Sequence, residues 1–393
     1  MNATKNNPFN PNYAVPPGTI LEEWLEEHGM SQTALAERMD RPIKTINELI
    51  KGKTSFTQET AFQLEAVTGI EGSFWTNADR IYQERAARLE EEERLKSWVD
   101  WAKGFPFPEM VNFGWVAPAT NPVVRVRILL RFFGVATPEA WEVVYGSFQV
   151  AYRKSRAFNG NAAHLGAWLR QGELSAAKLV CADYDETRFK GALTELRRLT
   201  TAPPDHACAR LVEQCKAAGV AVALVPELPK THVCGATRWV GPAKALIQMS
   251  LRYKTDDHLW FTFFHEAGHI LLHGKKDVFV EFNGKDDPKE KEADRWAADF
   301  LVPPAEWRRF RTAGRMKSQD IQSFASELGI HPSIIVGRLQ HEKCIPFVAC
   351  NDLKRRLCLV SAETKPANAN ELRSGPHHLS PRPPRSEPIS WMP

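Results

Sequence analysis

The stretch WFTFFHEAGHILLH at residues 260–273 limits what this chain can fold into more than any other part of its sequence. Its apolar side chains predict a buried helix, yet the same stretch contains His265, Glu266 and His269. In a helix, side chains four residues apart lie on one face, so the two imidazoles can reach a single metal ion. Glu266 lies beside them, where it can contact a water molecule at the ion without being a ligand.

An alternative for this stretch is a core helix whose histidines bond to backbone carbonyl groups. The hydrophobic surroundings count against it, because a buried Glu266 without partners would be costly. Glycine inside a helix costs about 1 kcal/mol, so Gly268 predicts that another segment approaches closely there. A third histidine ligand from the same straight helix would be poorly placed for a tetrahedron, so we expect His273 to pack beside the ligands or to support them.

A later helix, KEKEADRWAADFLVP at 289–303, contains the candidates for a third protein ligand, which a catalytic zinc usually has. Apolar residues mark its inward side: Ala293, Ala297, Phe300 and Leu301. Glu290 lies on that side and is the predicted ligand, whereas Glu292 lies on the solvent side. Asp294 is placed to accept the free ring N–H of a ligating histidine.

The predicted cofactor is Zn²⁺, with Mn²⁺ as the alternative, and the predicted chemistry is peptide hydrolysis. Such an ion acidifies water and polarises a carbonyl group. Glu266 would take the proton of the water and pass it to the leaving amine. The extended run ALIQMSL at 245–251 is predicted to pair with a substrate strand by β-augmentation.

Length and composition predict a globular protein of two or three domains. The chain has 393 residues, of which 43% are hydrophobic and 25% charged, and its net charge of +4 does not by itself argue for a nucleic-acid or membrane surface. No apolar run is long enough for a transmembrane helix, and the N-terminus lacks the apolar core of a signal peptide. The seven cysteines are scattered without a CxxC pair, so a disulfide framework is not expected and a cytoplasmic location is the simplest.

Composition and periodicity predict a multidomain chain with an all-α module, a helical middle region and an α+β domain. The predicted segments are a disordered lead at 1–16, the all-α module at 17–79, the helical linker and middle region at 80–204, the α+β domain at 205–360 and a Pro- and Ser-rich disordered tail at 361–393. Residues 80–95, RIYQERAARLEEEERL, are polar almost all round and predict a solvated connecting helix. The alternative is a short dimerisation coil, which would make the protein a homodimer.

The motifs of the α+β domain resemble those of the ImmA/IrrE family of metallopeptidases. The matching motifs are FTFFHEAGHILLH, the E-x-x-A-D-x-x-A that begins at Glu290, and LVP at 301–303. The resemblance spans roughly 205–350 and implies a zincin-like metallopeptidase domain with His265, His269 and Glu290 as ligands and Glu266 as the base. It also implies a zinc-dependent endopeptidase whose usual substrate is a DNA-binding repressor, cut to derepress stress or mobile-element genes. Trp296 departs from the phenylalanine that the family commonly has.

Residues 31–53, SQTALAERMDRPIKTINELIKGK, resemble the helix-turn-helix of the Cro/C1-type, HigA-antitoxin-like family. Gln32 opens the first helix, Ala36 lies where the two helices pack closely, and the second helix is expected to begin at Pro42. The resemblance implies DNA contacts by Gln32 and by the second helix, whose groove-facing residues would be Arg41, Lys44, Thr45, Asn47 and Glu48. Lys51 and Lys53 would lie near phosphates.

The acidic net charge of this module leaves open whether it binds DNA or protein. Residues 1–79 contain six basic and eleven acidic side chains, although residues 38–53 contain five basic and only two acidic ones. DNA binding is therefore expected to be weak or to depend on a partner. The alternative is a helix-turn-helix that contacts protein.

Two classes of function follow. The first is a cytoplasmic zinc endopeptidase with a DNA-binding module that cuts a transcriptional regulator. The second is a transcription factor or HigA-like antitoxin whose metallopeptidase-like domain senses a metal, ligand or partner without proteolysis. The intact HEAGH motif together with Glu290 favours the first, because a protease that had lost its function would be free to lose Glu266.

Overall fold

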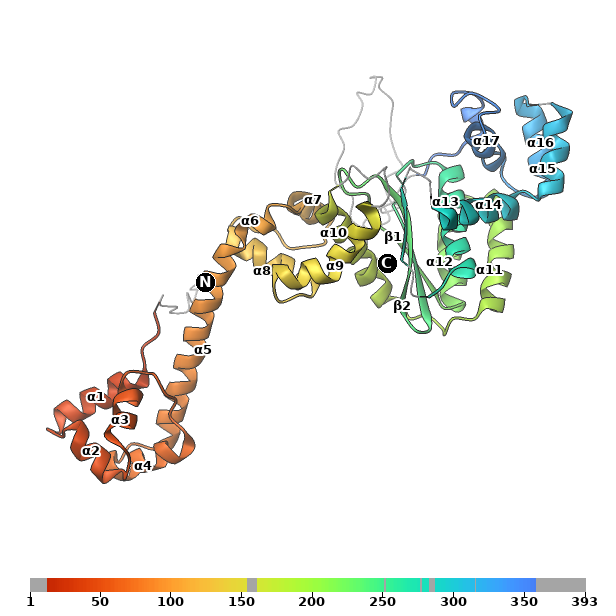
Figure 1. The fold of residues 1–393 in the computed structure, drawn as a ribbon. Coiled ribbons are helices and arrows are strands. Elements are labelled where there is room, and N and C mark those ends of the chain that lie inside the picture. Colours follow the sequence, from red (N-terminus) through yellow and green to blue (C-terminus); the bar gives the residue numbers. More distant parts are fainter. Residues whose placement is uncertain are drawn as a thin grey trace, which may run out of the picture. The chain divides into compact units, whose positions relative to one another are not determined.

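The computed structural model describes residues 13–153, 161–250, 252–275, 278–282, 287–314 and 316–357. Residues 1–12 of the predicted disordered lead and the whole predicted tail at 361–393 lie outside these ranges. The chain divides into two compact units, Met1–Val99 and Asp100–Pro393 (Figure 1). The predicted fold class, a multidomain chain with a helix-turn-helix module and an α+β domain, is confirmed.

The first unit consists of helices. They are α1 (Pro17–Glu27), α2 (Gln32–Arg38), α3 (Ile43–Ile50), α4 (Gln58–Thr68) and the long α5 (Gly72–Ser97). The hydroxyl of Ser31 accepts a hydrogen bond from the backbone N–H of Ala34 and so caps the start of α2. Leu21, Ile46 and Trp75 are fully buried in the core that these helices share.

The second unit begins with helices that pack around aromatic side chains. These helices are α6 (Val99–Ala102), which begins at the boundary, α7 (Phe107–Asn112), α8 (Pro122–Phe133), α9 (Pro138–Arg153) and α10 (Ala162–Lys178). Phe105, Phe133 and Trp141 meet one another at ring-centroid distances between 5.1 and 5.7 Å. Aromatic pairs at such distances stabilise a core beyond their buried area.

A four-stranded sheet follows, with β1 (Val220–Leu224), β2 (Val233–Gly241), β3 (Lys244–Met249) and β4 (Phe279–Phe282) in the order β1-β3-β2-β4. β3 pairs in parallel with β1 and antiparallel with β2, and β2 pairs antiparallel with β4. The prediction that residues 245–251 pair with a substrate strand is wrong, because both edges of β3 are already hydrogen-bonded. Of that run, Leu251 lies outside the described residues.

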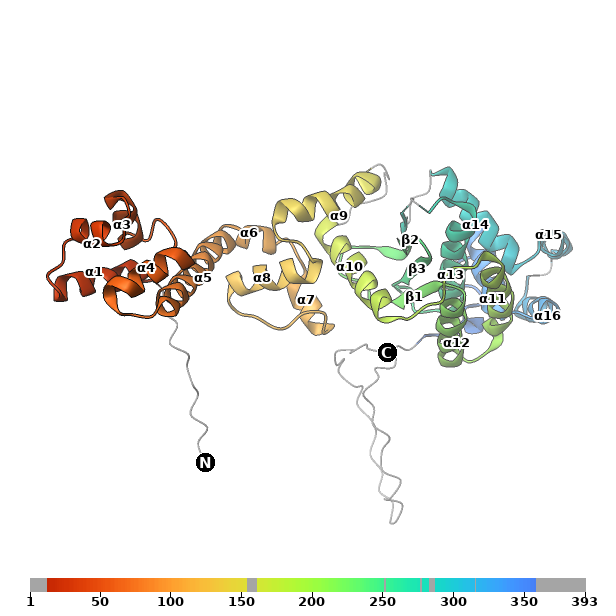
Figure 2. The ribbon, with the colours of Figure 1, turned by 90° about the horizontal axis from the view of Figure 1, so that it is seen from below.

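Helices cover both faces of the sheet (Figures 1 and 2). On one face lies α10, where the indole N–H of Trp168 donates to the carbonyl of Val225 at 3.0 Å and the Gln248 amide donates to the carbonyl of Trp168 at 2.6 Å. On the other face lie α11 (Glu186–Arg198), α12 (Pro204–Ala217) and α13 (Asp256–Leu272). Phe189 of α11 belongs to the same core cluster as the strands, although its sequence falls within the predicted middle region.

The described part of the chain ends with α14 (Pro288–Leu301), α15 (Pro304–Ala313), α16 (Ser318–Leu328), α17 (Pro332–His341) and the 3-10 turn Asn351–Leu353. Another 3-10 turn, Leu199–Thr201, lies between α11 and α12. The last described segment returns to the start of α13. There the Arg355 guanidinium donates to Asp256 at 2.7 Å and Lys354 pairs with Asp257 at 2.6 Å. None of the helices in the described part of the chain combines the length and apolar character that a membrane span needs.

Candidate metal centre

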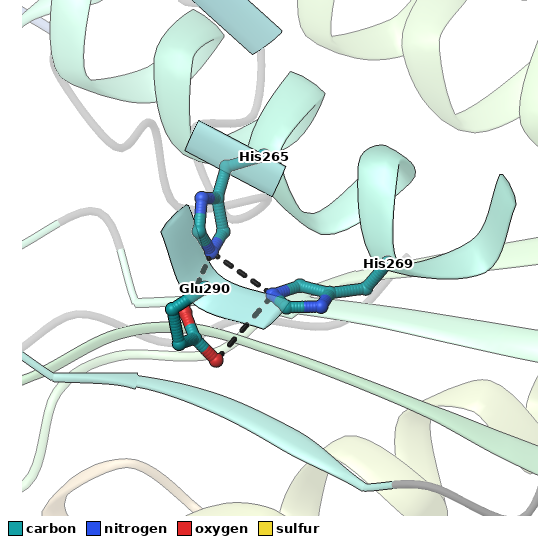
Figure 3. A group of neighbouring side chains, drawn as sticks. All are labelled: His265, His269 and Glu290. Atoms are coloured by element: carbon teal, nitrogen blue, oxygen red, sulfur yellow. Dashed lines mark hydrogen bonds and ion pairs between the residues drawn. The ribbon is translucent and has the colours of Figure 1, made fainter. Parts of the chain in front are cut away.

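The two histidines of the HEAGH motif lie on one side of α13 and point to a common centre (Figure 3). The Nε2 atoms of His265 and His269 are 3.0 Å apart, and both residues are almost completely buried. Glu290 of α14 lies opposite them. Its Oε2 is 3.1 Å from Nε2 of His265 and its Oε1 is 3.5 Å from Nε2 of His269.

Close packing of α13 against α14 brings Glu290 to this position. Ala293 and Ala297, the small residues of the inward stripe of α14, are fully buried. A Cβ atom at Gly268 would lie 3.1 Å from the Trp296 ring and 3.5 Å from the Cα of Ala293. The predicted close approach at Gly268 is therefore confirmed, and the approaching segment is the helix that carries Glu290.

The three donor groups fit a divalent cation. Their ligand atoms lie within 4.8 Å of one another, and two of them come from imidazoles and one from a carboxylate, a donor set that zinc accepts. Donor atoms around a tetrahedral zinc ion lie roughly 3.3 Å apart, which is close to the observed separations of 3.0, 3.1 and 3.5 Å. The donor set is compatible with both Zn²⁺ and Mn²⁺.

The ring nitrogens that face away from the centre also have partners. Nδ1 of His265 lies 3.0 Å from the carboxylate of Asp294, at the position expected for this aspartate. Nδ1 of His269 lies 3.0 Å from Nδ1 of His273. The ring of Phe279 in β4 stacks on His269 with a centroid distance of 4.0 Å. Such contacts fix the orientation of both rings before a metal binds.

The protonation states at the centre suit a metal ligand set. Burial lowers the pKa of His269, and a hydrogen bond with Glu290 opposes this shift only in part. Burial acts to raise the pKa of Glu290, but its hydrogen bonds with His265 and His269 outweigh that effect and lower the pKa to about 2. At neutral pH the carboxylate is ionised and His269 is neutral, as metal binding requires.

Glu266 is fully buried beside the centre, against strand β2. A Cβ atom at Gly235 of β2 would lie 2.9 Å from both Cγ and Cδ of Glu266, so any larger residue at this position would displace this carboxylate. Thr237, two residues on, donates its hydroxyl to the backbone carbonyl of Glu266 at 3.1 Å. The sequence reasoning missed Gly235, although an isolated glycine inside a strand is a known signal of close approach.

The residues expected to contact DNA lie on and around α3 of the first unit. Lys44, Lys51 and Lys53 are exposed, and Thr45, Asn47 and Gln32 are partly exposed. Helix α3 begins at Ile43, with Pro42 as its N-cap residue, one position later than the sequence predicted.

Arg41 is partly exposed, and its guanidinium is already bound by two side chains. Its Nε donates to Gln63 at 2.8 Å, and its Nη2 pairs with Glu59 at 2.7 Å. Both partners belong to α4, so this guanidinium is held against a neighbouring helix. Glu48 also lies 3.8 Å from Lys44, a distance at which it partly neutralises that lysine.

Two family models match separate parts of the chain. Residues 21–75 match the model described as helix-turn-helix, and residues 247–340 match the model described as IrrE N-terminal-like domain. The second match contains the three candidate ligands and Glu266.

Three known proteins are similar to parts of the chain. Virulence-associated protein I of Dichelobacter nodosus is 31% identical over 80 residues, which are 20% of this chain and 74% of that protein. The uncharacterized HTH-type transcriptional regulator YddM of Escherichia coli (strain K12) is 32% identical over 66 residues, which are 17% of this chain and 70% of that protein. The solved structure of an addiction module antidote protein of a HigA family from Coxiella burnetii is 27% identical, covers 21% of this chain and 92% of its own, and has a TM-score of 0.20.

Proposed function

Because this chain belongs to the helix-turn-helix DNA-binding proteins and also carries an IrrE N-terminal-like domain, we propose that it is a metal-dependent endopeptidase that cuts a DNA-binding repressor. The observation that carries this proposal is the convergence of His265, His269 and Glu290 next to a buried Glu266. Two imidazoles and a carboxylate leave one coordination position for water or substrate, which is the arrangement of catalytic rather than structural zinc sites. We take Zn²⁺ as the working ion and the control of stress or mobile-element genes as the outcome.

In this mechanism His265, His269 and Glu290 hold the cation. A bound divalent cation supplies Lewis-acid chemistry, which acidifies water and polarises the substrate carbonyl. Glu266 accepts the proton of the attacking water and delivers it to the amine that leaves. Asp294 keeps the proton of His265 on Nδ1, so that Nε2 presents its lone pair to the cation.

We propose that the substrate strand pairs with β4, since both edges of β3 are hydrogen-bonded to other strands. β4 is the last strand in the described sheet order, and its Phe279 stacks on His269, so the strand runs beside the centre. An extended peptide that formed main-chain hydrogen bonds with the side of β4 that no described strand occupies would run past the cation. Hydrogen exchange on the Glu266→Gln variant with bound repressor tests this: slower exchange of β4 amides is expected, and protection confined to other segments contradicts it.

The proteolytic function is tested with purified protein, Zn²⁺ or Mn²⁺, and repressors encoded near its gene. We expect metal-dependent cleavage by the wild-type protein and none by Glu266→Gln. Elemental analysis should find the same bound metal in both and little in His269→Ala. Cleavage that persists in Glu266→Gln would contradict the assigned base.

The second function is a transcriptional regulator or antitoxin whose metal centre acts as a sensor. The similarity to an HTH-type transcriptional regulator favours it. This function predicts that Zn²⁺ changes the affinity of the protein for DNA equally in the wild type and in Glu266→Gln. A metal-independent affinity would contradict it.

A further inference from the structure

His273 lies at the end of the metal helix and connects His269 to a second carboxylate. It is the C-cap residue of α13, and its side chain is 4% exposed. Its Nδ1 is 3.0 Å from Nδ1 of His269, and its Nε2 is 3.4 Å from Oε2 of Glu292. Glu292, expected on the solvent side of α14, is 60% exposed but reaches back to this ring.

The chemistry of the two rings permits one arrangement of protons when a cation is bound. His269 presents Nε2 to the centre, so its proton must be on Nδ1, which then donates. The facing Nδ1 of His273 must accept that hydrogen bond, which leaves the proton of His273 on Nε2. That N–H points to the carboxylate of Glu292, an acceptor when ionised.

We propose, on the basis of the metal-binding function proposed above, that Glu292 and His273 are positioning residues that fix the tautomer and orientation of His269. Their role for His269 is the role that Asp294 has for His265, which it contacts directly. The two ligating histidines are thus each aligned by a carboxylate, one in direct contact and one through an intervening imidazole.

A purely structural role would require His273 only for packing and Glu292 only for folding. The ring of Phe279 packs on His273 at 4.9 Å as well as on His269, so an aromatic side chain at 273 would satisfy the packing alone. The exposure of Glu292 means that its contact with His273 adds little to folding. Loss of Glu292 should therefore act on metal binding and leave the fold unchanged.

The test compares substitutions that keep or remove the acceptor opposite His269. His273→Phe keeps packing and removes the acceptor, whereas His273→Asn places an amide oxygen where Nδ1 was. We expect the affinity for Zn²⁺, measured by competition with a chromogenic chelator, to fall 10- to 100-fold in His273→Phe. It should recover substantially in His273→Asn, and Glu292→Ala should show a smaller loss than His273→Phe.

Matched controls separate this proposal from the proposed function. Glu213→Ala removes a similarly exposed carboxylate whose partner is Lys216 on the same helix, and should leave the affinity unchanged. Circular dichroism and the unfolding midpoint of the zinc-free proteins establish that every variant folds. Nitrogen-15 spectra of the zinc-free protein report the tautomer of His269, and a mixed population is expected in His273→Phe.

Two outcomes are distinct failures. A wild-type protein that binds no Zn²⁺ overturns the metal-binding function. A wild type that binds Zn²⁺ with the same affinity and the same His269 tautomer as His273→Phe overturns the positioning role alone.

Discussion

Replacing Gly235 by alanine should disturb the predicted base, Glu266, without disturbing the metal ligands. The added Cβ would lie 2.9 Å from Cγ and Cδ of Glu266 and closer still to its Oε1. Carbon atoms in contact prefer separations of about 3.5–4.0 Å, so the carboxylate must move by about 1 Å. The nearest atoms met by the Cβ all belong to Glu266, so the ligands themselves are not displaced.

The expected consequence is a loss of rate without a loss of metal. A displacement of about 1 Å of a reacting group can cost about 10²-fold in rate, which corresponds to about 2.7 kcal/mol of barrier. Because the obstructed group is the end of a flexible side chain, we expect the fold to be retained. Gly241→Ala is the matched control on the same strand, since a Cβ at Gly241 meets nothing within 4 Å.

The assay measures initial rates of repressor cleavage together with Zn²⁺ affinity for both variants. Gly235→Ala should cleave about 100-fold more slowly at unchanged affinity, and Gly241→Ala should behave as the wild type. A Gly235→Ala protein with full activity would refute the assignment of Glu266 as the base. A parallel loss of Zn²⁺ would show instead that β2 supports the ligands.

Three further predictions concern the ligands and the anchoring of α13. Asp294→Asn should weaken Zn²⁺ binding about 10- to 100-fold in a chelator competition, because the ring N–H of His265 loses a charged acceptor. As pH falls, protons compete with the metal for His269, and burial lowers the pKa of this residue. The affinity for Zn²⁺, measured at several pH values, should therefore stay constant down to about pH 6.5 and fall below it. Asp256→Asn should reduce the free energy of unfolding by about 3 kcal/mol in urea, because the buried carboxylate binds Arg355. Unchanged affinity in Asp294→Asn, a loss of affinity already above pH 7, or an unchanged urea midpoint would each contradict the corresponding reasoning.

The sequence was most informative where a helical period relates residues close along the chain. The spacing of His265 and His269 predicted their common face, and the apolar stripe of the later helix singled out Glu290 from Glu292. Both family resemblances are confirmed by the family matches. The two inferences from spacing have one basis: a helix converts sequence spacing into direction without any knowledge of the remaining fold.

Features that depend on pairing between distant segments could not be predicted in this way. Residues 245–251 have the composition of a strand, but nothing local indicates that the strand they contribute to, β3, lies between β1 and β2. Glu292 was placed on the solvent side because periodicity locates a Cα, whereas a long carboxylate reaches around its helix to His273. The pairing of Arg355 with Asp256 joins residues 99 positions apart and follows no local pattern.

The proposed proteolytic function gives the fusion of a helix-turn-helix module to the metal-binding domain a purpose that can be tested. Binding near a repressor on DNA would raise the local concentration of the protease around its substrate, with no new contact to the repressor. Charge reversal at the exposed Lys44 and Lys53 should therefore slow the cleavage of a DNA-bound repressor and leave the cleavage of free repressor unchanged. The difference between the two substrates should shrink as salt is raised, since contacts to phosphate weaken with salt. If the variant cleaves both substrates equally slowly at every salt concentration, the helix-turn-helix recognises the repressor itself rather than DNA.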